Sequence, residues 1–352
     1  MDEPEDAPPL DLELLRGFAF ECRPDCGLCC YAEPRVLAAE RARLLTIVPE
    51  AEFEGGGREL FLSAHPNGGA CRLLEENRCR AHPARPHPCR EFPLTVHVGT
   101  RLQATVVLSC PGVGLSALSE GPGRRPPPLG EGFATELAAL RERVDRSVVP
   151  RLAAAARRRR KVVRLLQDEG RWVDEEEVRD EMRRGIPMPV DEDFPVPDPP
   201  SADDGIESLP LFFDRRAAPV AIAQGLGGWE LLELSPRGGR SRSLGVVPPP
   251  DRRPELAPDA ARALHGYLRY WLERDALFGA VHLAMAEATD GSVVEWVADE
   301  LRGIGALVLA RAVVRAKLAR GIVSTLSLAD LQDGVRATDQ DLLDRGSWGD
   351  RF

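Results

Sequence analysis

The chain has 352 residues, of which 43% are hydrophobic and 29% are charged, and its formal net charge is −10. This length can bury a substantial core, and it suggests two or three structural units. An acidic protein has no bulk attraction to nucleic acid, so we expect no nucleic-acid partner.

The N-terminal stretch, MDEPEDAPPLDLELL, is acidic. It has neither the basic start nor the apolar segment of a secretory signal, which favours a cytoplasmic location. In that compartment thiols stay reduced, so clustered cysteines are more often metal-binding or catalytic than disulfide-bonded.

The cysteines are confined to one part of the chain. All eight precede residue 111: Cys22, Cys26, Cys29, Cys30, Cys71, Cys79, Cys89 and Cys110. Eight thiols suffice for two centres of four thiolates, and a soft tetrahedral set selects Zn²⁺ or an iron–sulfur cluster. We therefore predict that all eight are metal ligands. Free buried thiols and disulfides are the alternatives, but core cysteines have no reason to cluster in this way.

The adjacent pair Cys29–Cys30 is awkward for a single ion, because neighbouring side chains diverge. The two thiols are expected to serve two separate centres, or one of them to support the other. The compact N-terminal triplet and the Cys110–Pro111 pair are similar to ferredoxin-type ligation. This favours a [4Fe–4S] cluster, with zinc as the alternative.

Charged and ring side chains accompany the later cysteines. Arg80, Arg85 and Arg90 could offset the negative charge of bound thiolates, although a solvated loop position is about equally expected for each. At most one or two of the histidines in the cysteine segment are expected to be ligands or supporting donors, and His82 is singled out. These histidines are His65, His82, His87 and His97.

The blocks CRPDCGLCC, CRLLEENRCRAHPARPHPCREFP and SCPG resemble the YkgJ-type cysteine-cluster proteins, which are described as zinc- or iron-chelating and carry a CxxCxxCC motif. The second block agrees with the family pattern at Cys71, Leu74, Cys79, Arg85, Pro86, Cys89, Arg90, Phe92 and Pro93. PRVLAAERARL is similar to the family's short helix. The chain departs from the pattern in its first gap, which has three residues instead of two, and at Tyr31, Ala81 and His82. The resemblance covers about residues 18–113 and implies metal binding there.

Two enzyme classes are the alternatives. Cys22, Cys26 and Cys29 have the C-x3-C-x2-C spacing of radical-SAM enzymes, but Leu28 stands where an aromatic is usual and no strand–helix alternation follows. The chain has an N-terminal cysteine cluster followed by a long helix-rich remainder. This organisation is also similar to that of flagellin lysine methylases, which would imply methyl transfer to a protein. We favour a redox or binding module with an unidentified protein or redox partner. Whether the chain is an enzyme stays open, and no catalytic residue is predicted.

The rest of the chain divides by composition. Residues 10–125 are predicted to form an irregular domain that is held together by bound metal. It ends in the Gly- and Pro-rich stretch GPGRRPPPLGEG, residues 121–132, which breaks regular structure. Residues 131–187 have a helical pattern that is interrupted at Pro150 and includes VDEEEVRDEMRRG, with an Asp cap and a Gly stop. RRRRK, residues 157–161, is expected on a solvated helix face rather than on nucleic acid.

A proline-rich acidic linker is expected over residues 188–205. Residues 206–352 should form a small β hairpin or meander, with QGLGGW (224–229) as a hairpin turn, and then C-terminal helices. Apolar stripes predict their core faces: Leu264, Leu268, Trp271 and Leu272, then Val297, Leu301, Ile304 and Val308. The apolar run 303–310 is too short to span a bilayer, which needs about 20 residues, so no membrane partner is expected. The fold class is α+β, mainly α.

Overall fold

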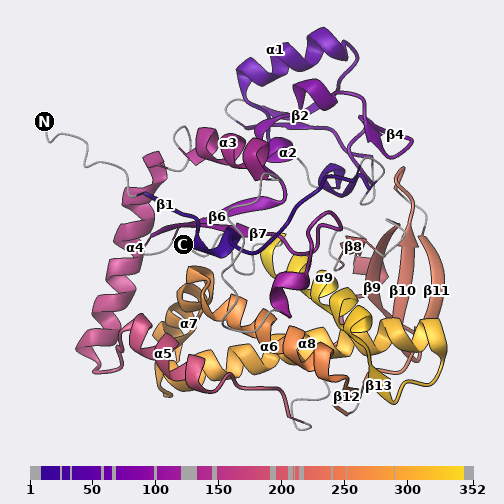
Figure 1. Ribbon diagram of the computed structural model, residues 1–352. Coiled ribbons are helices and arrows are strands. Elements are labelled where there is room, and N and C mark those ends of the chain that lie inside the picture. Colours follow the sequence, from indigo (N-terminus) through magenta and orange to yellow (C-terminus); the bar gives the residue numbers. More distant parts are fainter. Residues whose placement is uncertain are drawn as a thin grey trace, which may run out of the picture.

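The computed structural model describes residues 9–23, 26–31, 34–56, 59–65, 69–98, 101–119, 133–144, 149–190, 196–204, 209, 211–213, 218–238, 241–250, 252–288 and 290–344. The chain is α+β with helices predominating, as predicted (Figure 1). The cysteine-bearing elements lie at the top of Figure 1, and the C-terminal helices lie below them. The predicted linker at 121–132 is outside the described residues.

The cysteine region has short helices and three small sheets. Its helices are α1 (Ala38–Ile47), which the sequence predicted, and α2 (His87–Glu91). Its strands are β1 (Leu10–Asp11), β2 (Phe53–Gly56), β3 (Glu59–Leu62), β4 (Leu74–Glu75), β5 (Arg78–Cys79), β6 (Leu94–Val98) and β7 (Leu102–Val106). β1 pairs parallel to β7, and β6 pairs antiparallel to β7, whereas β2–β3 and β4–β5 are isolated hairpins.

Three helices follow: α3 (Ala134–Arg143), α4 (Val149–Asp168) and α5 (Glu175–Arg184). α4 begins one residue before Pro150, where proline costs no hydrogen bond within the helix. α5 has the predicted ends, because the Asp174 carboxylate accepts from the Glu176 amide and Gly185 follows the last turn. The RRRRK run lies on α4 and is exposed except at Arg159, which is 5% exposed and forms an ion pair with Glu175.

A four-stranded antiparallel sheet corresponds to the expected hairpin or meander. Its strands are β8 (Leu211–Phe213), β9 (Pro219–Gly225), β10 (Gly228–Leu234) and β11 (Ser241–Val247), in the order β11-β10-β9-β8. The predicted hairpin turn joins β9 to β10, and Gly227 adopts a φ of 86° there, which glycine allows without strain. Residues 196–204 of the expected linker contact this sheet, because the Gln224 amide donates to the Pro200 carbonyl at 2.9 Å.

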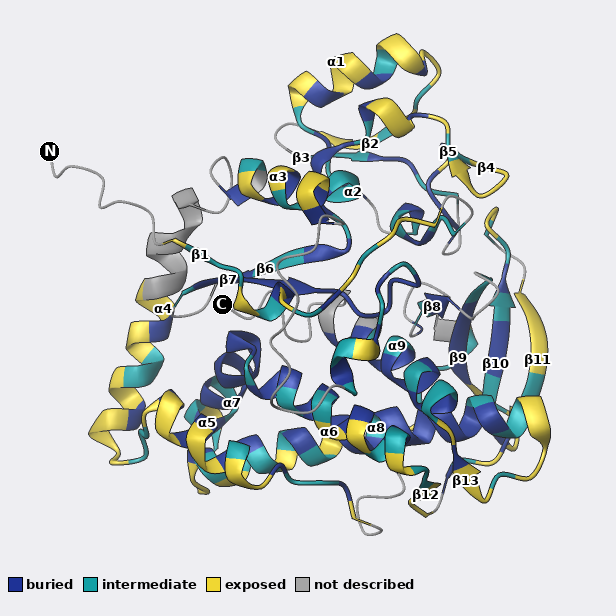
Figure 2. Cartoon of the chain, viewed as in Figure 1, coloured by how far each residue is buried: buried dark blue, intermediate teal, exposed yellow. Residues whose placement is uncertain are grey.

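The C-terminal helices are α6 (Pro258–Leu272), α7 (Asp275–Glu287), α8 (Val293–Arg320) and α9 (Leu328–Asp344). The two-residue strands β12 (Glu255–Leu256) and β13 (Thr325–Leu326) pair in parallel beside them. Figure 2 shows that α6 to α8 bury extensive faces, whereas α1 is mostly exposed. Both predicted apolar stripes are buried, which confirms them as core faces. Within the described part of the chain, no helix has the length and apolar character that crossing a membrane requires.

One hydrophobic cluster extends along the chain from Leu15 through Cys110 to Leu342. A second cluster contains Cys30 and Cys71 with Val36, Leu44 and other small apolar residues. The cysteine region therefore shares its main core with the C-terminal helices and has a smaller core of its own around the cysteines.

A buried ion pair fixes the C-terminal helices against the end of β7. Arg274 and Asp339 are both 0% exposed, and their Nη1 and Oδ1 atoms lie 3.0 Å apart. Asp339 Oδ2 accepts the Leu108 amide at 2.6 Å, and Arg274 Nη2 donates to the Val106 carbonyl at 3.1 Å. The pair thus compensates both of its charges while holding the backbone that leads to Cys110.

We predict that Asp339→Ala lowers the free energy of unfolding by about 3–5 kcal/mol, because it leaves the Arg274 charge buried and unpaired. Denaturant unfolding measures this change. Asp180→Ala, which removes an exposed carboxylate paired with Arg183, is the control and should cost at most about 0.5 kcal/mol. Equal effects of the two substitutions would show that the buried pair does not stabilise the fold.

Candidate metal centre

Five of the eight cysteines line one small cavity. They are Cys29, Cys30, Cys71, Cys79 and Cys89, and the cavity has a volume of about 10 Å³. The five come from four separate segments: the 3₁₀ turn Leu28–Cys30, the chain before β4, strand β5 and helix α2. Apolar side chains and Arg85 complete the lining. Tertiary packing therefore brings together thiols that are up to 60 positions apart.

The turn that carries the adjacent pair depends on glycine. Gly27 precedes it in the left-handed conformation, with φ +66°, and a Cβ atom there would lie 3.1 Å from Leu74 Cδ1. The Cys30 amide donates to the Gly27 carbonyl at 2.9 Å, which closes the turn. The Cys30 carbonyl then accepts the Cys71 amide at 2.6 Å, so the backbone joins the first two cysteine segments directly.

A tight hairpin positions the next cysteine. Glu76 and Asn77 connect β4 to β5 with φ values of 49° and 60°, the double left-handed conformation of a two-residue hairpin turn. The register then places Cys79 opposite Leu74, the side chain that packs on Gly27. The hairpin and the glycine turn therefore support each other.

Helix α2, which carries Cys89, is held by a buried carboxylate on α1. Glu40 Oε1 accepts the His87 amide at 2.8 Å, and Oε2 lies 3.2 Å from His87 Nδ1. Arg90 also donates to Glu40, at 3.3 Å, and its guanidinium reaches Glu142 on α3. His87 and Arg90 thus orient the helix and do not line the cavity.

The other three cysteines lie outside this cavity lining. Cys22 is exposed, Cys26 is half-buried and Cys110 is buried. Burial raises the pKa of all three thiols, to about 11 at Cys26 and about 12 at Cys110. Cys29 raises each of these pKa values further, and Cys26 also raises that of Cys110. The three thiols are therefore electrostatic neighbours of Cys29.

Thiol hydrogen bonds link the members of the cavity group. Hydrogen bonding with Cys30 lowers the pKa of Cys29 and lowers that of Cys79 to about 7, while the pKa of Cys30 itself is raised. Burial raises the pKa of Cys71 to about 11 and raises that of Cys89. Several adjacent thiolates in an apolar pocket are unfavourable, because burial and mutual repulsion both disfavour the charged form of each thiol. A divalent cation bound among them would offset this cost.

Arg85 is the one of the three predicted arginines that lines the cavity, and it lowers the pKa of Cys29 and Cys79. Arg80 is instead paired with Glu50 and Glu75 at the surface. His82 is exposed, and none of the four predicted histidines is among the described residues of the lining. His97 Nε2 lies 3.3 Å from Thr105 Oγ1, within the β6–β7 sheet.

The donor set suits a thiophilic metal, although the thiols do not yet converge on one point. Among the residues that the structure describes, no three or more His, Cys, Asp or Glu side chains are spaced to hold one ion. All eight cysteines are free thiols. A cysteine sulfur moves by rotation about its χ1 bond, so the distances between these thiols depend on their rotamers as well as on the backbone.

An arginine that the sequence did not predict, on the C-terminal helix, holds the loop of the last cysteine. Arg336 on α9 donates to the carbonyls of Leu108 at 3.0 Å, of Cys110, and of Val113 at 2.9 Å. Its positive charge lowers the pKa of the Cys110 thiol against the larger effect of burial. No sequence signal connects positions 226 residues apart, so only the fold reveals this support.

Comparison with known families agrees with this arrangement. Residues 21–110 match the model of the CxxCxxCC family, whose description is "Putative zinc- or iron-chelating domain". The matched segment contains all eight cysteines, and the match is consistent with the resemblance to YkgJ-type proteins. No curated protein and no solved structure matches the chain. Residues 21–110 are therefore similar to a cysteine-cluster domain that is described as zinc- or iron-chelating.

We predict that Arg336→Met loosens the Cys110 loop. Loss of three hydrogen bonds from a charged donor should speed amide hydrogen exchange across residues 107–113 by at least about tenfold. Exchange measured by mass spectrometry should be unchanged in strands β9 and β10. Arg302→Met, which removes a half-buried arginine of α8 that is paired with Asp299, is the matched control. Unchanged protection of residues 107–113 would refute the role of Arg336.

A second prediction concerns acid stability. Burial disfavours the Glu40 carboxylate, but hydrogen bonds from His87 and the Leu37 amide outweigh this and lower its pKa from 4.5 to about 2. The carboxylate therefore stabilises the fold above pH 4.5, and this contribution is lost as the pH falls towards 2. Glu40→Gln should cost about 1–3 kcal/mol at pH 7.

Urea unfolding at several pH values tests this prediction. The difference between the wild type and Glu40→Gln should shrink progressively between pH 4.5 and 2. Glu54→Gln, at an exposed position on β2, should match the wild type throughout. A difference that stays constant over this range would show that Glu40 does not act through its charge.

Proposed function

We propose that residues 21–110 form a metal-binding module in which two groups of four cysteines meet at the Cys29–Cys30 pair. One group consists of Cys30, Cys71, Cys79 and Cys89. The other consists of Cys22, Cys26, Cys29 and Cys110. The observation that carries the proposal is the convergence of five cysteines, from four segments of the chain, on one cavity.

The position of Cys29 supports the division into two groups. Cys29 raises the pKa of Cys71 and Cys89 in the cavity and also that of Cys22, Cys26 and Cys110 outside it. It therefore stands between the two sets. Cys29 and Cys30 share the cavity and a thiol hydrogen bond, and we assign Cys30 to the cavity group and Cys29 to the outer group because Cys29 alone also acts on Cys22, Cys26 and Cys110.

The size of the cavity supports a single ion in the cavity group. A volume of about 10 Å³ is close to the smallest that can hold one water molecule. Four thiolates around one ion of this size are the usual donors of structural zinc. Zinc bound there would cross-link the β4–β5 hairpin, α2 and the glycine turn, and its binding energy would add to the stability of the fold.

An iron–sulfur cluster is the second candidate, and it is better supported at the outer group. Cys110 directly precedes Pro111, as the last cysteine of a ferredoxin-type site does. Cys22 is exposed, so this group is accessible to a partner. A cluster there would give the module a redox role with a protein partner, whereas zinc in both groups would make it a structural or binding module.

Metal analysis of the full-length protein, purified without oxygen, tests the proposal. We expect bound zinc or iron, with acid-labile sulfide and absorbance near 400 nm only if a cluster is present. Cys71→Ser and Cys89→Ser should release the cavity metal to a chelator at least about tenfold faster, and Cys26→Ser should affect only the outer group.

His82→Ala is the matched control, because His82 lies in the same loop but outside the cavity lining, and it should retain all metal. Metal-free protein, or metal retention that is indifferent to every cysteine substitution, would contradict the proposal. A single metal lost equally in all cysteine variants would contradict the division into two groups.

A further inference from the structure

An exposed basic surface lies on the second half of helix α4, in the part of the chain that contains no cysteine. Figure 2 shows this half of α4 along the edge of the molecule, and most of its positions are exposed. Arg159 and Leu166, which are 5% and 0% exposed, form the opposite, buried side of the helix. The exposed basic residues, called here the basic face of α4, are Arg157, Arg158, Arg160, Lys161 and Arg164.

Helical geometry places these side chains together. Positions three, four and seven residues apart lie on one side of an α-helix, so Arg157, Arg160 and Arg164 follow one line along it. Lys161 lies beside this line, and Arg158 lies at its margin. With a rise of 1.5 Å per residue, the line from Arg157 to Arg164 is about 10 Å long. The five charges therefore form one continuous surface.

The charges of the basic face are not neutralised within the part of the molecule that the structure describes. There, no hydrogen bond or ion pair joins any of the five side chains to another residue. By contrast, Arg183 on α5 is paired with both Glu176 and Asp180. Like charges three or four positions apart destabilise a helix. The basic face therefore carries a repulsion that an anionic partner would relieve.

The surroundings of the basic face favour an acidic protein segment over a nucleic acid. Asp168 is exposed at the end of α4, and Glu177 and Glu181 are exposed on α5, the next helix. These carboxylates would repel a long polyanion that extends past the face. Leu165 is 41% exposed beside Arg164 and Lys161, and it offers an apolar contact that a phosphate backbone cannot use.

The spacing of the three arginines on the line fits a helical partner. Successive arginines are three or four residues apart, which corresponds to about 5 Å along the axis of α4. Carboxylates at the same spacing on a second helix would match all three. In an extended strand, side chains on one face are about 6.6 Å apart, so the third carboxylate would already lie about 3 Å out of register.

We propose that the basic face of α4 binds an acidic helix of a partner protein, whose carboxylates pair with Arg157, Arg160 and Arg164. An apolar side chain of the same partner helix packs on Leu165. Guanidiniums bind carboxylates through two parallel hydrogen bonds, which fixes the register of the two helices. This proposal does not depend on the metal-binding function, because α4 contributes nothing to the candidate metal centre.

The test uses three labelled probes of equal negative charge, titrated into the full-length protein and followed by fluorescence anisotropy. The first is an Ala-rich helical peptide with one leucine and with glutamates at positions i, i+3, i+4 and i+7. The second has the same composition, but its glutamates are distributed around the helix. The third is a single-stranded RNA. We expect the first peptide to bind at least about tenfold more tightly than the other two probes, and its affinity to fall as salt is added.

A triple variant, Arg157→Gln, Arg160→Gln and Arg164→Gln, tests where the peptide binds. Glutamine has nearly the helix propensity of arginine, so circular dichroism should be unchanged. Loss of three exposed ion pairs should weaken binding of the first peptide about tenfold. The matched control makes the same charge change at three exposed arginines of other segments and should keep the wild-type affinity. It consists of Arg237→Gln, Arg252→Gln and Arg262→Gln.

The outcomes separate the possible partners and the two functions. RNA that binds as tightly as the first peptide would show that the face recognises phosphate, and this would overturn the proposal. Equal binding of the two peptides, no binding of the first peptide, or an affinity that the triple variant leaves unchanged would also overturn it. Cys71→Ser should bind the first peptide as the wild type does, whether or not this variant retains metal.

Discussion

The buried ion pair between Arg274 and Asp339 joins the C-terminal helices to the cysteine region, and the rest of the structure depends on this contact. Both side chains are fully removed from water, so neither charge is tolerable without the other. Asp339 also accepts the Leu108 amide and the Tyr267 hydroxyl, and Arg274 also donates to the Val106 carbonyl. The pair can form only when α6, the turn that follows it, α9 and the end of β7 are all in place, which makes the assembly of these elements cooperative.

This constraint gives the C-terminal helices a part in the candidate metal centre. Arg336 lies one helical turn before Asp339 on α9, and both side chains bind the backbone around Cys110. Leu28, beside the adjacent cysteine pair, belongs to the same hydrophobic cluster as the helices. The cysteine loops are therefore supported by a core much larger than a 90-residue cysteine-rich segment could bury.

Local signals predicted much of the fold because their physical causes are local. The caps of α5, the glycine turn before β10 and the apolar stripes of α6 and α8 depend on neighbouring residues alone. Strand β11 was not predicted, because it is mostly exposed and has no apolar alternation. Arg159 was expected in solvent, but Glu175 on the next helix compensates its charge and makes its burial tolerable.

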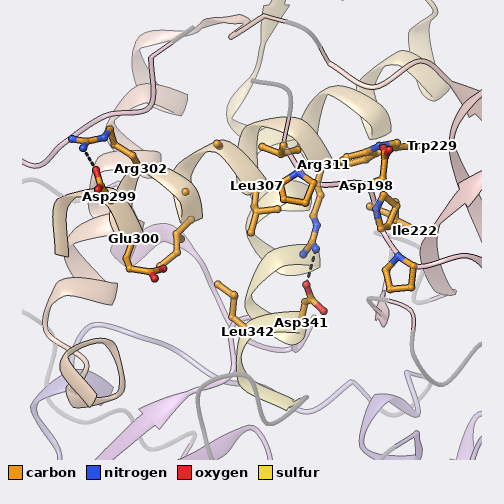
Figure 3. A pocket seen from close by; sticks show the side chains of 17 residues that line it. Asp198, Ile222, Trp229, Asp299, Glu300, Arg302, Leu307, Arg311, Asp341 and Leu342 are labelled. Carbon is orange, nitrogen blue, oxygen red and sulfur yellow. Dashed lines mark hydrogen bonds and ion pairs between the residues drawn. The ribbon is translucent and has the colours of Figure 1, made fainter. Parts of the chain in front are cut away.

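The sequence by itself determined the chemistry of the candidate centre: eight soft donors in one segment, with three arginines beside the later cysteines. The tertiary structure decided which five cysteines share a cavity, that Arg85 and not Arg80 lines it, and that Arg336 holds the Cys110 loop. It also formed a second cavity, between the four-stranded sheet and the helices α8 and α9 (Figure 3). The type of donor atom is a property of a single residue. The convergence of the cysteines on one cavity depends on how distant segments pack, and the spacing of residues along the chain does not directly encode this packing.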